Sequence, residues 1–445
     1  MSWDQLPDLV ISKILSYLDL LDRIHASKTC VKWQEASQSP EVWHRFEYSE
    51  NALWELLFTA GIPCTTEDIK LFDQVSEEIQ EVVQRNVRYF KHVNIALRGI
   101  TSFALFIEIC KNCSNLRDLS IYQLIQQHNS SESLEPLGTL LERNKELRHL
   151  RIEDMTKFGE KNSPVPMGLT HGKHMKTLWI VNSFNSNSLS NVMYLINLKE
   201  LAISPKHLNF SLLRQLASHS LKELYIVANS KTREFYNEAL SAFHWKEICK
   251  SGPSLRVHCF LAVSHEWAQK EVFLKPNMPL ASLVYRKRTW LKYIESLSLV
   301  MTRYRETLEE FVDFALTEGP YRHPGNGDYQ DRVDKHIIFM VRYCPKLKVL
   351  IIKEMLSSAA LILMAFLNRG LTGLFIREDM IKYVNDLPEN ELIMVGDDSC
   401  RTMVRNHWTK DKLCKGMSSL LGIDWKPMTV ENYREFVAQR YAKFT

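Results

Sequence analysis

The chain has 445 residues, of which 45% are hydrophobic, 24% charged and 10% aromatic, and these fractions are close to those of globular proteins. This composition excludes wholesale disorder, and the length predicts two or three folding units or an elongated repeat array. The 56 Lys and Arg residues against 52 Asp and Glu residues give a formal charge of only +4. A dedicated nucleic-acid surface needs a stronger basic stripe, so we expect no nucleic-acid partner.

Two further properties limit where the protein is expected to work. The longest uninterrupted apolar run, Ala359–Leu367, has nine residues, about half of what crosses a bilayer, so we expect no membrane partner. The apolar stretch Leu9–Ile11 is broken at once by Ser12 and Lys13, which does not fit a signal peptide. We therefore expect the nine cysteines to be reduced and the protein to be cytoplasmic, nuclear or both.

Residues 3–46 show the spacing of three short helices. The first has apolar residues at every fourth position with two more beside them: Leu6, Val10, Ile14 and Leu18, then Ile11 and Leu15. Pro7 suits the first helical position, Asp22 is expected to cap a second helix, and Ser39 is expected to cap a third. Such a small unit buries too little surface to be stable alone, so some of its apolar side chains are expected to face a partner.

The same region resembles an F-box. The resemblance rests on these features: Leu6-Pro7-Asp8, the apolar stripe, Asp22, Cys30, Trp33 and Trp43. In that family the motif binds the adaptor Skp1, which bridges to a cullin scaffold and a RING subunit. The resemblance implies a Skp1-binding surface made by six side chains: Leu6, Pro7, Ile11, Ile14, Leu15 and Leu18. The amino-acid sequence of this region looks closest to that of F-box only proteins 33 and 39. The alternative is that three helices simply cover the end of a larger domain.

One short sequence motif, called the phrase below, recurs along the rest of the chain. An anchor residue is followed three residues later by Leu-x-Ile in five copies: Leu116–Ile121, Leu147–Ile152, Met175–Ile180, Leu198–Ile203 and Leu221–Ile226. Weaker versions occur at Phe90–Ile95, Ile294–Leu299, Leu347–Ile352 and Leu371–Ile376, and residues 255–261 keep only the alternation of a strand. Successive starts from Phe90 to Leu255 are 23 to 34 residues apart, which is mostly the period of leucine-rich repeats.

The phrase has a physical explanation. Leu-x-Ile buries alternate side chains of a strand, while the anchor fills the turn that enters it. Three residues before the anchor stand Cys113, Asn144 and Cys344, where leucine-rich repeats use Cys or Asn to satisfy buried backbone groups. Residues 103–109 and 134–141 have helical spacing and are expected to form an outer layer. The predicted fold class is therefore α/β, an F-box followed by a curved leucine-rich-repeat solenoid.

The expected organisation has four parts. They are the F-box at 3–46, a helical linker or N-terminal cap at 47–86, irregular repeats at 87–380, and a C-terminal helical cap at 381–445. Insertions are expected at 264–293 and 302–343, the second with helical patterns at 308–315 and 333–341 around a loop at 319–327. Thr429 is expected to cap a helix that covers the last repeat with one apolar face: Tyr433, Phe436, Val437, Tyr441 and Phe444.

An F-box followed by leucine-rich repeats resembles the substrate receptors of SCF ubiquitin ligases. This implies Skp1 as a partner, cullin and RING through Skp1, and an unidentified protein substrate. Alternate strand residues would point to the concave face, where aromatic and arginine side chains are common hot spots. The candidate substrate-binding residues are Arg151, Trp179 and Tyr225, followed by Lys353, Phe375 and Arg377. The alternative is a scaffold that binds Skp1 outside a ligase, or a repeat scaffold without Skp1.

Motifs of catalysis do not accompany this pattern. Cys110 and Cys113 form a lone Cys-x-x-Cys with no second pair at zinc-finger spacing, and His171 and His174 lack the glutamate of a zinc protease. There is no Gly-x-Ser-x-Gly elbow, and no cysteine stands in the context of a ligase nucleophile. We therefore expect a non-catalytic adaptor with no cofactor, no metal and no catalytic residue.

Overall fold

The chain forms two compact units. A computed structural model describes residues 6–57, 65–123, 135–154, 172–183, 186–228, 232, 240–262, 274–285, 290–313, 333–389, 398–406 and 409–444. Unit 1 contains residues 1–203 and 211–221, and unit 2 contains residues 204–210 and 222–445. The loop expected at 319–327 and His171 lie outside the described residues.

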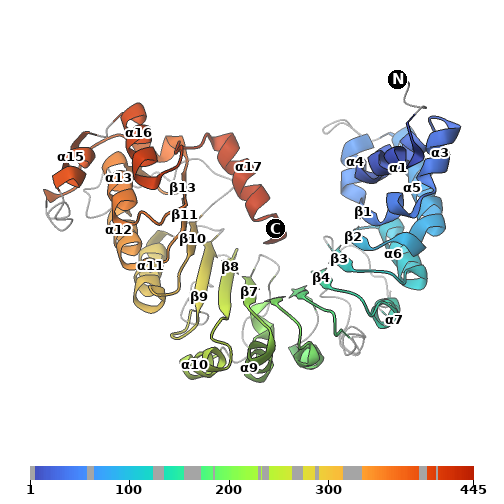
Figure 1. Cartoon of the computed structure of the whole chain (residues 1–445), viewed down its shortest axis with the longest axis horizontal. Helices are drawn as coiled ribbons and strands as arrows, with labels where there is room; N and C mark the ends of the chain where they lie inside the picture. Colours follow the sequence, from blue (N-terminus) through green and yellow to red (C-terminus); the bar gives the residue numbers. More distant parts are fainter. Residues whose placement is uncertain are drawn as a thin grey trace. The chain divides into compact units, whose positions relative to one another are not determined.

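Short helices form the N-terminal domain of unit 1 (Figure 1). They are α1 Asp8–Tyr17, α2 Leu20–Ser27, α3 Val31–Ser37 and the 3-10 helix η2 Pro40–Trp43. Pro7 directly precedes α1, and Pro40 begins η2, as suits a residue without an amide hydrogen. The carboxylate of Asp19 caps α2 by accepting a hydrogen bond from the Asp22 amide at 2.9 Å, so the expectation that Asp22 is the cap was wrong. Extended backbone at Cys30 then separates α2 from α3.

The segment expected as a helical linker contains helices, but its first residues belong to a strand. β1 Arg45–Ser49 pairs in parallel with β2 His92–Leu97, so the N-terminal domain leads directly into the sheet. The helices that follow are α4 Glu50–Leu57, α5 Thr66–Asn86 and the 3-10 helix η3 Val87–Tyr89. Thr65 and Asp68 form a capping box at the start of α5. The stacked rings of Phe46 and Phe90, with centroids 4.9 Å apart, pack β1 against the residues that precede β2.

Parallel strands in chain order make the sheet of unit 1. After β1 and β2 come β3 Asp118–Gln123, β4 His149–Glu153, β5 Thr177–Val181 and β6 Glu200–Ile203. The connecting helices are α6 Ile100–Asn112, α7 Glu135–Arg143, the 3-10 helix η5 Ser186–Tyr194, and α9 Phe210–His219 after β6. The register aligns Leu119, Leu150, Leu178 and Leu201 in one row, and all four are buried. The repeated phrase therefore builds the strand and core positions that it predicts.

Asn144 satisfies buried backbone at the turn into a repeat strand. Its side-chain oxygen accepts a hydrogen bond from the Leu116 amide at 2.8 Å, and its amide donates to the carbonyl oxygens of Cys113 and Leu140 at 3.1 and 2.8 Å. Asn368 occupies the same position before a later anchor and donates to the Leu347 carbonyl at 3.0 Å. This is the role that the sequence pattern assigned to Asn144.

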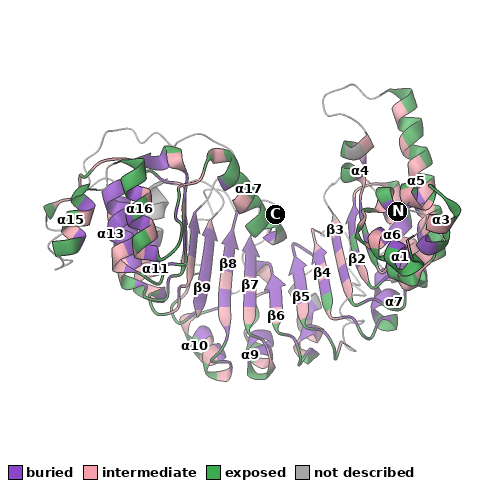
Figure 2. Cartoon of the chain, turned by 45° about the horizontal axis from the view of Figure 1, so that its top comes forward, coloured by how far each residue is buried: buried purple, intermediate pink, exposed green. Residues whose placement is uncertain are grey.

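The sheet of unit 2 has the same parallel arrangement, with strands again in chain order (Figure 2). Its strands are β7 Glu223–Ala228, β8 Arg256–Leu261, β9 Leu280–Tyr285, β10 Glu310–Asp313, β11 Val349–Ile352 and β13 Gly373–Ile376. Its helices before β13 are the 3-10 helix η6 Pro205–His207, then α10 Ala242–Ser251, α11 Trp290–Tyr304, α12 Asp334–Tyr343 and α13 Ser358–Leu367. Together these elements form an α/β leucine-rich-repeat solenoid, as predicted.

Two strands of unit 2 lie where insertions were expected. β9 falls within residues 264–293 and β10 within residues 302–343, while the phrase at Ile294–Leu299 belongs to helix α11. These three expectations were wrong because short apolar runs fit the helical and the strand period equally well. In the structure, Leu308 is a buried anchor and Phe311 a buried strand residue. The helix expected around Val333–Val341 is present as α12.

The longest apolar run of the sequence forms α13, whose residues from Ala359 to Ala365 are buried. α12 packs against α13, and so do α15 Asp398–Asn406 and α16 Lys410–Leu421. A small parallel sheet of β12 Leu356–Ser357 and β14 Ile381–Lys382, with the 3-10 helix η10 Glu378–Met380, lies beside them. Of these elements, β14, α15 and α16 lie in the segment 381–445 for which a C-terminal helical cap was expected. Within the described parts of the chain, no helix combines the length and the apolar character needed to cross a membrane.

The last helix is not part of this cap. α17 Val430–Arg440 is capped by Thr429 as predicted, and the 3-10 helix η11 Ala442–Phe444 follows it. The Phe436 ring contacts the Phe375 ring of β13, with centroids 4.3 Å apart, but Phe444 stacks on Phe260 of β8. α17 thus crosses the face of the sheet that points away from α11–α13, here called the strand face (Figure 1). The helix was expected to cover the open end of the last repeat. Instead, the C-terminal segment contacts β13 and continues along the strand face as far as β8.

Candidate functional site

Helix α1 has two apolar sides with different surroundings. Ile11 and Leu15 are 0% exposed, and α1 packs against α2, α3 and η2. On the other side, Leu9 is 71% and Tyr17 77% exposed. We call this side the outer face of α1, and it consists of these residues, none of which is buried: Leu6, Pro7, Leu9, Val10, Ile14, Tyr17 and Leu18. An apolar surface of this kind in a small domain is typical of a site that binds another protein.

The burial divides the six residues that the sequence assigned to Skp1 binding. Leu6, Pro7, Ile14 and Leu18 retain accessible surface on the outer face. Ile11 and Leu15 fill the core of the domain, so their expected direct contact with another subunit is corrected to a supporting role. The helical period explains the difference, because positions 11 and 15 lie one turn apart on the side that faces α3. Val10 and Tyr17 were not assigned, although their spacing from Ile14 places them on the same side.

Arg23 holds the domain core together from inside. Its guanidinium donates hydrogen bonds to the carbonyl oxygens of Leu15, Leu18 and Arg45 at 3.2, 2.8 and 3.1 Å. It also lies over the Trp43 ring, 5.3 Å from the ring centroid. Burial lowers the pKa of Arg23. These bonds tie the C-terminal end of α1 to β1 and so fix the orientation of the outer face.

In unit 1, we use strand face for the side of the sheet opposite the buried row of Leu119, Leu150, Leu178 and Leu201. Arg151 and Trp179 meet on this side. The guanidinium of Arg151 lies 4.8 Å from the Trp179 ring centroid and 5.0 Å from that of Tyr122. Arg151 Nε also donates to the Glu153 carboxylate at 2.9 Å, and Trp179 Nε1 donates to Glu200 at 2.8 Å. The structure therefore brings two of the predicted substrate-binding residues together. Trp179 is only 4% exposed, so its ring supports Arg151 more than it offers contact area.

The same face of unit 1 has a polar hollow near its first strands. A pocket of about 370 Å³ is lined by residues of β1, β2 and β3 and by His44, which precedes β1. The His92 imidazole contacts the Asp118 carboxylate, and His149 lies 4.0 Å from the other oxygen of that carboxylate. This hollow combines acidic and histidine side chains. Nothing in the sequence pattern had singled out His92.

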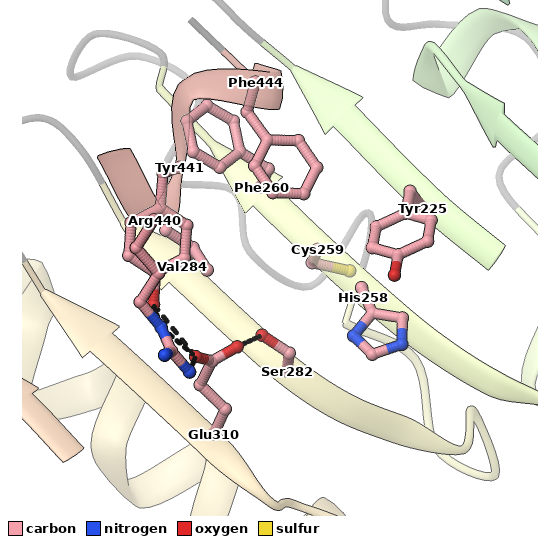
Figure 3. A pocket seen from close by; sticks show the side chains of 10 residues that line it. All are labelled: Tyr225, His258, Cys259, Phe260, Ser282, Val284, Glu310, Arg440, Tyr441 and Phe444. Carbon is pink, nitrogen blue, oxygen red and sulfur yellow. Dashed lines mark hydrogen bonds and ion pairs between the residues drawn. The ribbon is translucent and has the colours of Figure 1, made fainter. Parts of the chain in front are cut away.

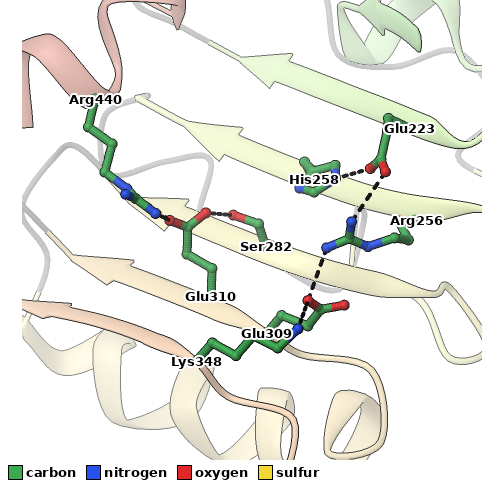
Figure 4. A network of polar contacts seen from close by, with 8 residues as sticks. All are labelled: Glu223, Arg256, His258, Ser282, Glu309, Glu310, Lys348 and Arg440. Carbon is green, nitrogen blue, oxygen red and sulfur yellow. Dashed lines mark hydrogen bonds and ion pairs between the residues drawn. The ribbon is translucent and has the colours of Figure 1, made fainter. Parts of the chain in front are cut away.

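In unit 2, a chain of ion pairs runs across the strands (Figure 4). Glu223 accepts hydrogen bonds from His258 and Arg256 at 2.6 and 3.2 Å. Arg256 also contacts Glu309 at 3.1 Å, and Glu309 contacts Lys348 at 3.0 Å. Burial alone would raise the pKa of Glu223, but its contacts with His258 and Arg256 outweigh burial and hold that pKa below its usual value. The predicted residue Tyr225 stacks on His258, with ring centroids 4.5 Å apart.

The C-terminal residues close a pocket of about 330 Å³ over β7–β10 (Figure 3). Its aromatic lining includes Tyr225 and Phe260 from the strands and Phe444 from η11. Its polar part is centred on Glu310 of β10. The pocket therefore joins an apolar half to an acidic half.

Glu310 has three hydrogen-bond donors around it. Ser282 Oγ lies 2.6 Å from Oε2, while Arg440 Nη2 and the Tyr441 hydroxyl each lie 2.9 Å from Oε1. Burial alone would raise the pKa of Glu310, but these hydrogen bonds and the charge of Arg440 outweigh burial and hold the pKa below its usual value. Glu310 is therefore a carboxylate that is built to hold a cation.

The other predicted residues of unit 2 have structural partners. Phe375 lies under Phe436 of α17. Lys353 contacts Asp313 at 3.2 Å, and Arg377 donates to Asp379 at 2.9 Å. The sequence analysis did not identify Glu310, because the segment around it fitted a helical period. Glu310 would have been found by assigning the strand to residues 310–313.

The cysteines of the Cys-x-x-Cys pair are buried in the repeat core. Burial raises the pKa of both thiols, that of Cys113 to about 11, and Cys113 Sγ lies 3.5 Å from the Phe90 carbonyl oxygen. Burial also raises the pKa of Cys344 to about 12. Such thiols are mostly protonated near neutral pH and are poor nucleophiles. Among the described residues, no group of three or more His, Cys, Asp or Glu side chains is placed to hold a metal ion.

Comparisons with known proteins agree with this architecture. Residues 3–45 match the F-box domain family. The chain is 22% identical over 443 residues to F-box/LRR-repeat protein 21 of Ovis aries, which covers 96% of this chain and 90% of that protein. It is also 22% identical over 398 residues to F-box/LRR-repeat protein 21 of Bos taurus, with 86% and 84% covered. The particular likeness to F-box only proteins 33 and 39 stays a prediction.

Proposed function

We propose that this chain, an F-box protein with leucine-rich repeats, is the substrate-recognition subunit of an SCF ubiquitin ligase. In this proposal the outer face of α1 binds Skp1, and through it cullin and RING, while the strand face of the repeats binds a protein target. The observation that carries the proposal is the outer face itself, because Leu9 and Tyr17 remain exposed beside a domain core that Ile11 and Leu15 already fill. The proposed place of work is the cytoplasm, the nucleus or both.

The proposed mechanism is proximity without covalent chemistry in this chain. A target held on the repeats is presented to a ubiquitin-charged enzyme bound elsewhere on the scaffold, so the effective concentration of its lysines at the thioester rises. The hydrogen bonds that tie Arg23 to the end of α1 support this role, because a rigid domain transmits position from adaptor to target. The four accessible candidates Leu6, Pro7, Ile14 and Leu18 are the proposed Skp1 contacts.

For the target, two parts of the strand face are proposed. In unit 1, Arg151 is held between two aromatic rings, which limits the freedom that it would lose on binding. In unit 2, Tyr225, Phe260 and Glu310 line the pocket beside the C-terminal residues. Aromatic and arginine side chains in such positions are typical binding hot spots. Lys353 and Arg377, which each contact a carboxylate as Arg151 also does, are further candidates.

A pull-down with purified Skp1 tests the first half of the proposal. The triple variant Leu6→Ala/Pro7→Ala/Leu18→Ala removes apolar surface from the outer face, and we expect it to lose Skp1. The matched control is Ile100→Ala/Ile196→Ala/Ile423→Ala, which removes three exposed aliphatic side chains far from α1 in sequence. The control is expected to bind Skp1 as the unaltered chain does. Full retention of Skp1 by the first variant would contradict the proposal.

A second candidate function has a specific observation in its favour. β1 joins the N-terminal domain directly to the repeat sheet, as a cap on the repeats would do. Co-purification from cells separates the possibilities. Cullin together with Skp1 supports the ligase subunit, Skp1 without cullin supports a scaffold that works outside a ligase, and the absence of both supports a cap.

A further inference from the structure

The last residues of the chain occupy a surface that the proposed function assigns to a target. We call residues 429–444 the C-terminal arm; they comprise the cap of α17, α17 itself and η11. The arm lies on the strand face of unit 2, where its side chains contact β13, β10, β8 and β7. A repeat helix in this protein packs on the opposite face, so the arm is not one more repeat element (Figures 1 and 3).

The residues before the arm are fixed to the last strand. The indole Nε1 of Trp425 donates to the Leu374 carbonyl at 2.8 Å. Met428 donates from its amide to the Ile376 carbonyl at 3.0 Å and accepts from the Glu378 amide at 2.8 Å. These backbone bonds hold the chain up to Met428 independently of any contact that the arm makes. The arm therefore has a fixed starting point from which it can leave the sheet.

The arm itself is held by side chains at regular intervals. Phe436 and Arg440 are four residues apart on one side of α17, and Phe444 follows four residues later in η11. Phe436 contacts the Phe375 ring, and Phe444 stacks on Phe260 with ring centroids 4.7 Å apart. α17 has 11 residues, and an isolated helix of that length is marginal in water, so its order depends on the strand face.

Between the two aromatic contacts lies a charged one. Arg440 Nη2 is 2.9 Å from Glu310 Oε1, and Tyr441 donates to the same oxygen. With the arm in place the Glu310 side chain is mostly buried and paired with Arg440, so a segment that covers it in the same way buries it again. Another occupant of this surface must therefore supply a cation at the same place, because an unpaired buried carboxylate is costly. An acidic or a purely apolar segment does not meet this requirement.

From these contacts we propose that the C-terminal arm is an internal ligand of the strand face of unit 2, and that a protein target displaces it. The displacing segment is helical and presents a basic residue, with arginine favoured, four residues after one aromatic side chain and four residues before another. This deepens the proposed function, on which it rests, by assigning a chemical class to the target segment. It also means that the free receptor is autoinhibited.

Fluorescence anisotropy with full-length chains tests the proposal. The probe is a synthetic peptide with the sequence of residues 429–444 and a fluorophore at its N-terminus. The opened variant Arg440→Glu/Phe444→Ala weakens the arm in the chain and leaves the strand face unaltered. We expect it to bind the peptide at least 10-fold more tightly than the unaltered chain. The matched control Arg434→Glu makes the same charge change on the exposed side of α17 and is expected to bind as weakly as the unaltered chain.

A third chain, Glu310→Arg/Arg440→Ala/Phe444→Ala, tests the charged contact, because its own arm has no carboxylate at position 440 that could pair with the new arginine. This chain is expected to lose the 10-fold gain for the peptide and to recover it for a peptide in which the arginine at position 440 is replaced by glutamate. Equal binding of the first peptide by the opened and unaltered chains would overturn the proposal. Equal binding of the first peptide by the opened chain and the third chain would overturn it as well.

Hydrogen exchange provides a readout that does not depend on added peptide. We expect arm amides to exchange faster in Arg440→Glu than in Arg434→Glu, and to be protected again in Glu310→Arg/Arg440→Glu. Protection of the β8 and β11 amides serves as the check that each variant is folded. Unchanged arm exchange in Arg440→Glu would overturn the proposal. Neither measurement involves Skp1, so a failure here is separate from a failure of the ligase assignment.

Discussion

Arg440 Nη2 lies 2.9 Å from Glu310 Oε1, although the two residues are 130 positions apart in the sequence. Glu310 comes from a repeat strand and Arg440 from the last turn of α17. Ser282 and Tyr441 complete the hydrogen bonds of the carboxylate. This contact explains why the C-terminal helix lies across the strands, and it gives the surface beneath it a defined charge preference.

We predict that the Glu310 carboxylate stabilises the bound state of the arm and that this stabilisation depends on pH. Its pKa is lowered in the folded chain, so its contribution is complete above the pKa of about 4.3 that an unfolded glutamate has. That contribution is lost as pH falls through the lower, folded pKa. We expect Glu310→Gln to reduce the free energy of arm opening by about 1–2 kcal/mol at pH 7, since charge-assisted bonds are lost. The difference should stay constant down to about pH 5 and shrink at lower pH.

Hydrogen exchange of the α17 amides measures this opening, after correction for the intrinsic exchange rate at each pH. Glu306→Gln is the control, because Glu306 is exposed and forms an ion pair with the neighbouring Arg305 at the surface. A difference between Glu310→Gln and the unaltered chain that grows as the pH falls would contradict the assignment.

The Phe375 and Phe436 rings are expected to be coupled. Their centroids are 4.3 Å apart, and an aromatic pair contributes about 0.5–1.5 kcal/mol beyond the area that it buries. A double-mutant cycle of Phe375→Ala and Phe436→Ala, read by hydrogen exchange of α17, should return a coupling energy in that range. The cycle of Phe375→Ala with the exposed Phe243→Ala should be additive within about 0.5 kcal/mol. Additivity in the first cycle would show that α17 is not seated on β13.

Two tyrosines of the C-terminal arm should respond differently to loss of their hydroxyl groups. The Tyr433 hydroxyl is buried without a hydrogen-bond partner among the described residues, whereas the Tyr441 hydroxyl donates to Glu310. Tyr433→Phe is therefore expected to be neutral or to stabilise by up to about 1 kcal/mol, and Tyr441→Phe to destabilise by about 1–2 kcal/mol. Thermal unfolding of the two variants side by side measures the difference. The reverse order of midpoints would refute this reading of the contacts.

Asn144 is expected to be essential to the repeat core. Asn144→Ala removes three hydrogen bonds and leaves the Leu116 amide and the Cys113 carbonyl buried without them, which we expect to cost about 2–4 kcal/mol. Asn197→Ala is the matched control, because Asn197 is exposed and donates one bond to the Lys173 carbonyl. Its cost should be below about 1 kcal/mol. Chemical denaturation followed by circular dichroism compares the two, and equal midpoints would exclude a special role for Asn144.

Substitutions on the two sides of α1 should separate an effect on folding stability from an effect on Skp1 binding. Ile11→Ala creates a cavity in the core of the N-terminal domain and is expected to cost about 2–5 kcal/mol. Tyr17→Ala removes an exposed ring and is expected to change stability by no more than about 0.5 kcal/mol while weakening Skp1 in the pull-down. Thermal unfolding and the pull-down are measured on the same preparations. If Tyr17→Ala lowered the stability and Ile11→Ala left it unchanged, the assignment of the buried and exposed sides of α1 would be contradicted.

The F-box and the repeats could be predicted because their signals are local. The apolar stripe of α1, with its spacing of four residues, and the Leu-x-x-Leu-x-Ile phrase each describe one element and its nearest neighbours. Repeat proteins are stabilised mainly by contacts between such neighbours. The same locality caused the errors at Leu308–Phe311 and Ile294–Leu299. A run of a few apolar residues does not distinguish a strand from a helix until its neighbours in space are known.

The amino-acid sequence by itself determined the α/β repeat architecture, the apolar stripe of the first helix and the amphipathic helix that Thr429 begins. Only the tertiary structure decided which side of α1 is buried, because that depends on the volume that α2, α3 and η2 leave beside it. It also decided that α17 crosses the strand face to place Arg440 on Glu310, since periodicity defines an apolar face but not the surface on which that face packs.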